Sequence, residues 1–198
     1  MNYLAHLFLS GDNELLMLGN FIADHIKGNK TKRFSQDVKK GIELHRKIDY
    51  FTDHHPKFLQ TKERLHERHH KYAGVVADIF YDHFLAVHWR KYSNIALTNY
   101  VSYCYGVLLK NYTILPSKTK RVLPFLIMQN WLSNYRTYDG LNRTFELMAR
   151  RVKYKSVIED AVTDLKKDYN KYNREFLDFF PDIQAYVKDN LDKLTGEI

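Results

Sequence analysis

Apolar residues recur along almost the whole chain at a spacing of three or four positions. This spacing gathers apolar side chains on one face of an α-helix and predicts a helical protein. Ser35 is a plausible helix N-cap, Pro56 disfavours continuation of the helix before it, and Gly74 is a candidate break in a long third helix. Short connections indicate a single-domain, irregular helical bundle over residues 1–198. The expected helices cover residues 13–27, 35–54, 57–90, 95–112, 118–136, 141–151 and 155–179, with a separate terminal helix from Pro181.

The segment SQDVKKGIELHRKIDYFTDHHP carries polar residues inside an apolar stripe. On a helix, His45 and Asp49 lie one turn apart on the face that also holds Ile42 and Ile48. This face should point toward the core, whereas the opposite face is rich in lysine and arginine. A buried carboxylate needs a partner or a metal ion, because desolvating an unpaired charge is costly. His45 and Asp49 are therefore either a structural hydrogen-bonded pair or part of a metal site.

Two further segments carry a carboxylate into apolar surroundings. In AGVVADIFYDHFLAVHW, Asp82 shares a helix face with Ile79, and the adjacent His83 lies beside Phe80. In the first long helix, Asp24 belongs to the largely apolar block GNFIAD. Three helices that each bring a carboxylate toward the core are most simply explained by a shared cation. The candidate metal ligands and catalytic residues are Asp24, His45, Asp49, Asp82 and His83.

The available ligand types restrict the expected ion. Imidazole and carboxylate ligands suit Mn²⁺, Fe²⁺, Zn²⁺ or Mg²⁺, and the single cysteine, Cys104, cannot build a thiolate zinc site. Two nearby residues stay open to two interpretations. His6, in the apolar segment NYLAHLFL, either packs in the core or supports the ligands. Asp78, one turn before Asp82, is either a supporting residue or an exposed one.

Charge and composition add an expectation about partners and location. Lys and Arg outnumber Asp and Glu by 31 to 23, a net charge of +8. This surplus favours an acidic partner, which includes nucleic acid, a phosphorylated small molecule or an acidic protein. We expect a cytoplasmic protein without a membrane partner, because one cysteine cannot form an internal disulfide, no basic leader precedes the first apolar segment, and no apolar run approaches about 18 residues.

Five blocks of the chain, in this order and spacing, resemble the bacterial acyl carrier protein phosphodiesterase family: MNYLAHLFLS, GNFIADHIKG, GIELHRKIDYFTDHHP, AGVVADIFYDHFLAVHW and NWLSNYR. That family is similar to a divergent branch of the HD phosphohydrolases, which are helical proteins with a His/Asp metal site. The resemblance covers Met1 to about Arg151 and implies an all-α, HD-phosphohydrolase-like fold. It also implies hydrolysis of holo-acyl carrier protein to the apo form and 4′-phosphopantetheine, usually with Mn²⁺. By position, it assigns the same five metal-site candidates, and His25 departs from the family pattern, which has an apolar residue there.

The resemblance implies that an acidic carrier protein docks electrostatically. The run KGNKTKR at 27–33 and the helix that follows it form a basic region beside the proposed site in sequence, and residues 150–155 form a second one. The alternative for both is an ordinary solvated surface. The candidate substrate-binding residues are Lys27, Lys39, Lys40, Arg46 and Lys47.

Two other functions are weighed against this one. The first is a metal phosphohydrolase of the same architecture that acts on a nucleotide or another small phosphoester. The second is a helical nucleic-acid binder, suggested by net charge alone. The second is disfavoured, because the sequence offers no recognisable recognition helix or stacking motif and a binder leaves the buried carboxylates unexplained.

Overall fold

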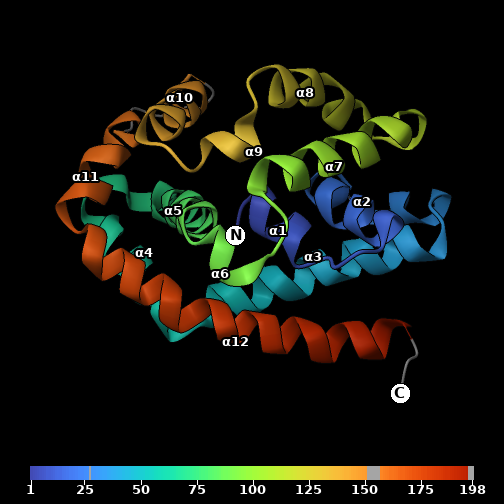
Figure 1. Cartoon of the computed structure of the whole chain (residues 1–198), viewed down its shortest axis with the longest axis horizontal. Coiled ribbons are helices and arrows are strands. Elements are labelled where there is room, and N and C mark those ends of the chain that lie inside the picture. The colour runs from blue at the N-terminus through green and yellow to red at the C-terminus, as the bar shows by residue number, and fades with distance from the viewer. Residues whose placement is uncertain (27, 151–156, 196–198) are drawn as a thin grey trace.

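The computed structural model describes residues 1–26, 28–150 and 157–195 (Figure 1). Every regular element within these ranges is helical, which confirms the all-α prediction. The α-helices are α1 (Tyr3–Phe8), α2 (Glu14–Ile22), α3 (Gln36–His54), α4 (Pro56–His69), α5 (Ala73–Val87), α6 (Trp89–Tyr92), α7 (Leu97–Lys110), α8 (Ser117–Met128), α9 (Trp131–Asn134), α10 (Tyr138–Ala149), α11 (Ala161–Lys167) and α12 (Tyr169–Thr195). The 3-10 turns are η1 (Ala23–His25), η2 (Gly28–Arg33), η3 (His70–Tyr72), η4 (Tyr112–Ile114) and η5 (Ile158–Asp160).

The short helix α1 lies at the centre of the molecule, packed against α2 and α5 (Figure 1). Its residues Leu4, Ala5 and Leu7 are fully inaccessible to solvent. The long helix α3 packs against α2, α4 and α12. In the view of Figure 1, α12 runs along the bottom and α8 lies at the top, on the opposite side of the molecule. No helix in the described part of the chain combines the length and apolarity needed to cross a lipid bilayer.

Helices α2 and α3 approach closely because each has a glycine where they cross. A Cβ atom added at Gly19 would lie 2.1 Å from the carbonyl oxygen of Val38, and one added at Gly41 would lie 2.1 Å from that of Leu16. Both distances are far inside van der Waals contact, so neither position accepts even alanine without moving the helices apart. This crossing sets the distance between the functional side chains of the two helices.

Several predicted boundaries were wrong for reasons of local conformation and packing. The predicted third helix does break near the candidate position Gly74, but the break is at His70, which adopts a φ of 46° and cannot continue a helix, and Gly74 lies inside α5. Helix α8 ends at Met128, before Asn130 with a φ of 45°. Pro181 starts no new helix and lies inside α12, where the neighbouring Phe180 is buried in the core. The predicted helix over residues 35–54 is confirmed as α3, and the predicted start at residue 155 lies outside the described residues.

Candidate metal centre

The buried side chain of Asn20, on α2, links α1 to α3. Its Oδ1 accepts hydrogen bonds from Nδ1 of His6 at 2.8 Å and from Nδ1 of His45 at 3.1 Å. Its Nδ2 donates to the carbonyl of His6 and to the hydroxyl of Ser10, both at 2.9 Å, which fixes the orientation of the amide. An amide oxygen can only accept, so both imidazoles carry a proton on Nδ1. The Nε2 atoms of both rings are therefore directed away from Asn20.

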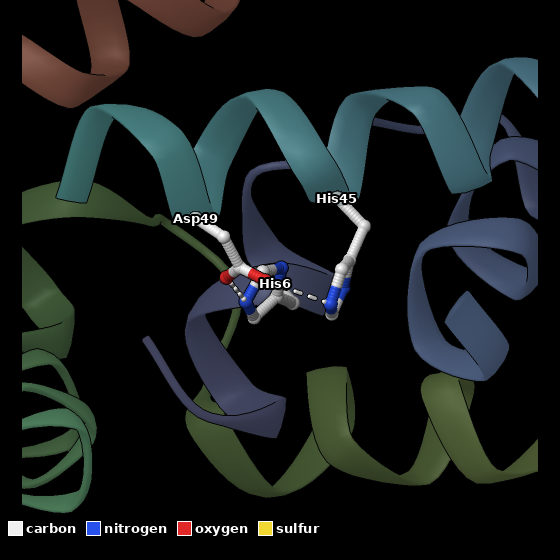
Figure 2. Close-up of side chains that lie close together, drawn as sticks. All are labelled: His6, His45 and Asp49. Atoms are coloured by element: carbon white, nitrogen blue, oxygen red, sulfur yellow. Dashed lines mark ion pairs between the residues drawn. The ribbon is translucent and has the colours of Figure 1, made fainter. Parts of the chain in front are cut away.

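The two Nε2 atoms converge on one carboxylate, that of Asp49 (Figure 2). His45 Nε2 lies 3.1 Å from Oδ2 of Asp49, and His6 Nε2 lies 3.1 Å from Oδ1. The imidazole rings stack with their centroids 4.1 Å apart. The ligand atoms offered by these three residues all lie within 4.8 Å of one another. Two successive turns of α3 and one turn of α1 thus build a compact His, His, Asp cluster.

Asp24 joins the cluster from its solvent side. It follows α2 in η1, its side chain is 67% exposed, and its Oδ1 accepts a hydrogen bond from Nε2 of His45 at 3.2 Å. Burial opposes a charge on His45, yet the hydrogen bonds to Asp24 and Asp49 raise its pKa to about 9. Burial lowers the pKa of His6 to about 4, so its ring is neutral. Burial alone would raise the pKa of Asp49, but the hydrogen bond from His45 and the positive charge of that ring hold it well below its usual range.

This donor arrangement fits a divalent cation. With its proton on Nδ1, the neutral His6 ring has a lone pair on Nε2, which lies 3.1 Å from an oxygen of Asp49 but makes no hydrogen bond of good geometry. Two electron-rich atoms at that distance repel each other unless positive charge lies between them. Two imidazole nitrogens with carboxylate oxygens are a ligand set suited to Mn²⁺, Fe²⁺ or Zn²⁺.

A cavity of about 200 Å³ opens beside the cluster. Its walls carry four carboxylates, and the only basic groups among its lining residues are His45 and the amino group of Met1. That amino group pairs with Asp78 at 2.9 Å, which raises its pKa although burial opposes the charge. A cavity with this charge balance would repel an anion unless a cation offset the carboxylates. The lining residues are Met1, Asp24, His45, Asp49, Asp53 and Asp78.

The structure does not bring Asp82 and His83 into the cluster. Asp82 is fully buried, and its two carboxylate oxygens accept hydrogen bonds from the amides of Leu4 at 2.8 Å and Ala5 at 3.2 Å. It therefore caps the first turn of α1 from a distant part of the sequence, and burial raises its pKa to about 7. His83 donates from Nδ1 to the carbonyl of Tyr135 at 2.8 Å. The positions of Asp82 and His83 support a role in the fold and do not support the predicted ligand role.

Of the lysines and arginine predicted to bind substrate, the four that the structure describes are not gathered at the cluster. Lys47 donates to Asn190 on α12 at 3.0 Å, so it faces the opposite side of α3 from the cluster. Lys40 pairs with Asp37 on its own helix at 3.9 Å. Lys39, Lys40, Arg46 and Lys47 are absent from the lining of the cavity at the cluster. Lys27 lies outside the described residues.

Two residues of the centre were not assigned from the sequence. His6 was left between a core and a supporting role, and Asn20 was not recognised as the residue that orients both rings. The available signal was the presence of a polar side chain in each of two apolar segments, NYLAHLFL and GNFIAD. Only the packing of α1 between α2 and α5 shows that these two side chains meet.

Comparisons with known proteins give one consistent result. The family model described as acyl carrier protein phosphodiesterase matches residues 1–183. Curated proteins of that name include one from Serratia proteamaculans, 27% identical over 96% of this chain and 98% of its own length. Others come from an Enterobacter species, at 30% identity with the same coverage, and from Escherichia coli O139:H28, at 32% identity over 93% of this chain and 96% of that protein. No solved structure gives a significant match. The chain belongs to the acyl carrier protein phosphodiesterase family.

Proposed function

We propose that this protein hydrolyses the phosphodiester that joins 4′-phosphopantetheine to acyl carrier protein. Water adds to phosphorus, and the seryl oxygen of the carrier protein leaves, which yields apo-acyl carrier protein and 4′-phosphopantetheine. Membership of the family supports the reaction and the substrate. The observation that carries the proposal within the structure is the cluster of His6, His45 and Asp49 beside a cavity lined by carboxylates.

We further propose that the cluster holds a divalent cation, with Mn²⁺ as the first candidate. The ligand atoms would be Nε2 of His6, Nε2 of His45 and the carboxylate of Asp49, with Asp24 at the solvent edge. Such an ion lowers the pKa of an attacking water and polarises a phosphoryl oxygen. Asn20 supports this role, because it holds the Nδ1 protons and so directs both Nε2 atoms toward the ion, that of His6 with its lone pair free and that of His45 once its proton has left.

The carboxylates of the cavity make the cation necessary for substrate binding as well. A phosphodiester is an anion, and Asp24, Asp49, Asp53 and Asp78 surround the space that it must enter. Without added positive charge these groups repel it, because like charges in a partly enclosed space are only weakly screened by solvent. Loss of the cation should therefore weaken substrate binding in addition to abolishing turnover.

The test is incubation with holo-acyl carrier protein, with and without Mn²⁺, followed by intact mass spectrometry of the carrier protein. We expect loss of the phosphopantetheine mass only when the cation is present. The variants Asp49→Asn and His45→Ala should abolish this turnover and weaken Mn²⁺ binding in calorimetry by at least about tenfold, with helical content retained. The matched control is His54→Ala on the same helix, because His54 is exposed and its hydrogen bond and ring contact are both with Tyr50, away from the cluster.

Wild-type turnover by either site variant in excess Mn²⁺ would show that the altered residue has a structural role alone. Hydrolysis of nucleotides with holo-acyl carrier protein left intact would instead support the related metal phosphohydrolase that acts on small phosphoesters. Binding of Mn²⁺ without hydrolysis of any phosphoester would retain the metal centre and reject the reaction.

A further inference from the structure

A groove of about 840 Å³ begins at Asp24, on the solvent side of the candidate metal centre. One wall is η2, which contributes Lys32 and Arg33. The other wall is the beginning of α8, which contributes Lys118 and Lys120. Asp24 lines both this groove and the smaller cavity at the cluster, so the two spaces adjoin at that residue. A basic groove therefore leads to an acidic cavity.

The groove is formed in advance of binding, because side-chain contacts fix its walls. A hydrogen bond of 2.7 Å joins Nδ1 of His25 in η1 to Oγ1 of the buried Thr119 in α8. Lys120 donates to the carbonyl of Thr113 at 2.9 Å, and its ammonium group lies 5.3 Å from the ring centre of Tyr112. His25 thus belongs to the groove and holds two of its elements together.

The outward face of α8 extends this surface. Residues Lys118, Arg121, Phe125 and Met128 fall on one face of the helix at spacings of three and four positions. The two cations lie at the end near the groove, and the two apolar side chains lie farther along. Phe125 is 57% exposed, and Met128, at 82%, is the most exposed large apolar side chain in the described part of the chain. Apolar anchors next to steering charges are typical of a protein-binding surface.

We propose that this groove and the outward face of α8 form the docking surface for the acidic carrier protein, and that the phosphodiester enters the metal centre past Asp24. The inference rests on the proposed function for the identity of the partner. The pantetheine arm beyond its phosphate is neutral and has no group that requires Lys32, Arg33, Lys118 and Lys120. An acidic protein face does require these basic residues. Without them, the carboxylates of the cavity would repel the carrier protein from the site where its prosthetic group must react.

The positions of the lysines on α3, the alternative docking surface, also support docking at the groove and α8. Lys47 and Lys40 on α3 are engaged by Asn190 and Asp37, and Lys47 faces α12. Helix α12 lies on the side of the molecule opposite to α8 (Figure 1). A carrier protein bound against α12 would be separated from Asp24 by the body of α3.

The experiment measures binding of apo-acyl carrier protein, which has the acidic face but no phosphodiester, so that docking is observed separately from hydrolysis. The double variant Lys32→Glu/Lys118→Glu should weaken this binding at low salt by about tenfold or more, because attraction becomes repulsion at two positions. The apparent KM for holo-acyl carrier protein should rise by a similar factor. The matched control is Lys188→Glu/Lys193→Glu, the same change of charge on exposed positions of α12, and it should change neither quantity.

The apolar part of the surface is tested by Phe125→Ala/Met128→Ala, which should weaken binding at all salt concentrations, since apolar contacts are not screened. Unchanged binding of apo-acyl carrier protein by both double variants on the α8 side would overturn the proposal. A loss caused by Lys39→Glu/Lys40→Glu instead would also overturn it and place docking on α3. Binding that depends on α8 without any hydrolysis of the holo-protein would support this surface and reject the proposed reaction.

Discussion

Replacing Gly41 by alanine should damage the fold and the metal centre together. The new Cβ would lie 2.1 Å from the carbonyl oxygen of Leu16, about 1.3 Å short of the 3.4 Å at which ordinary contact begins. Backbone atoms cannot rotate away as a side chain can, so α2 and α3 must separate by roughly this amount. Overpacking of this kind typically costs about 1–3 kcal/mol. For a chain of this length, each kcal/mol lowers Tm by about 2–4 °C.

The same separation should reach the cluster, because Asn20 belongs to α2 and His45 to α3. Their hydrogen bond of 3.1 Å would stretch to roughly 4 Å, which is too long to hold the proton on Nδ1 of His45. Loss of such an orienting contact commonly costs about 10–100-fold in metal affinity. We therefore expect Gly41→Ala to melt several degrees below the wild type and to bind Mn²⁺ at least about tenfold more weakly.

Thermal unfolding of the metal-free protein followed by circular dichroism measures the first effect, and calorimetric titration with Mn²⁺ measures the second. Gly106→Ala is the matched control, because Gly106 is exposed in the middle of α7 and a Cβ there meets no atom within 4 Å. Alanine at that position should leave Mn²⁺ binding unchanged and stabilise the protein by about 0.5–1 kcal/mol. A Gly41→Ala protein with wild-type Tm and wild-type Mn²⁺ affinity would refute the close crossing and its control of the site.

Three further outcomes are expected. Asp82→Ala should lower the free energy of unfolding by roughly 1–3 kcal/mol in urea titration, because two amides of α1 lose their acceptor, and full stability would exclude the capping role. Mn²⁺ affinity should rise about tenfold for each pH unit between pH 7 and about 9, because the raised pKa of His45 means that a proton must leave before the cation binds; an affinity independent of pH would contradict this. Cys104 should resist a disulfide-exchange reagent in the native protein and react after unfolding, because it is 0% exposed and burial raises the pKa of its thiol to about 12; rapid labelling of the native state would contradict this.

Three residues of the centre, Asp24, His45 and Asp49, were named from the sequence, and the clearest signal was the pair within one helix. His45 and Asp49 are four residues apart on a helix, so their common face follows from helical geometry alone. Asp82 was equally visible as a buried carboxylate, but periodicity shows only that a face is buried and not what lies opposite it. Its hydrogen-bond partners are backbone amides about eighty residues away in the sequence, and no local sequence pattern indicates them. The placement of α1 explains both outcomes. It brings His6 beside Asp49, and it presents the amides of Leu4 and Ala5 to Asp82.

The remaining differences between prediction and structure arose where sequence proximity was taken for spatial proximity or where packing overrode a local preference. Lys47 is two residues from His45, yet two residues turn a helix by more than half a revolution, and its side chain reaches α12. Pro181 disfavours a helix locally, but buried aromatic neighbours such as Phe180 hold α12 through it. These differences did not affect the predicted all-α fold class, because that prediction depends on hydrophobic periodicity summed over many residues.

The cap that Asp82 places on α1 has a consequence for how this family evolves. Helix α1 has six residues, too few to persist without its surroundings, and it carries His6 into the cluster. A mutation that removes the carboxylate at position 82 would release the first turn of α1 and displace His6, although Asp82 lies outside the cluster. Natural selection would therefore preserve this residue as strictly as a ligand. If Asp82 is invariant among relatives, the cause would be its role in anchoring α1 and not a catalytic role. An alignment alone would not distinguish these two causes, whereas the geometry of the structure does.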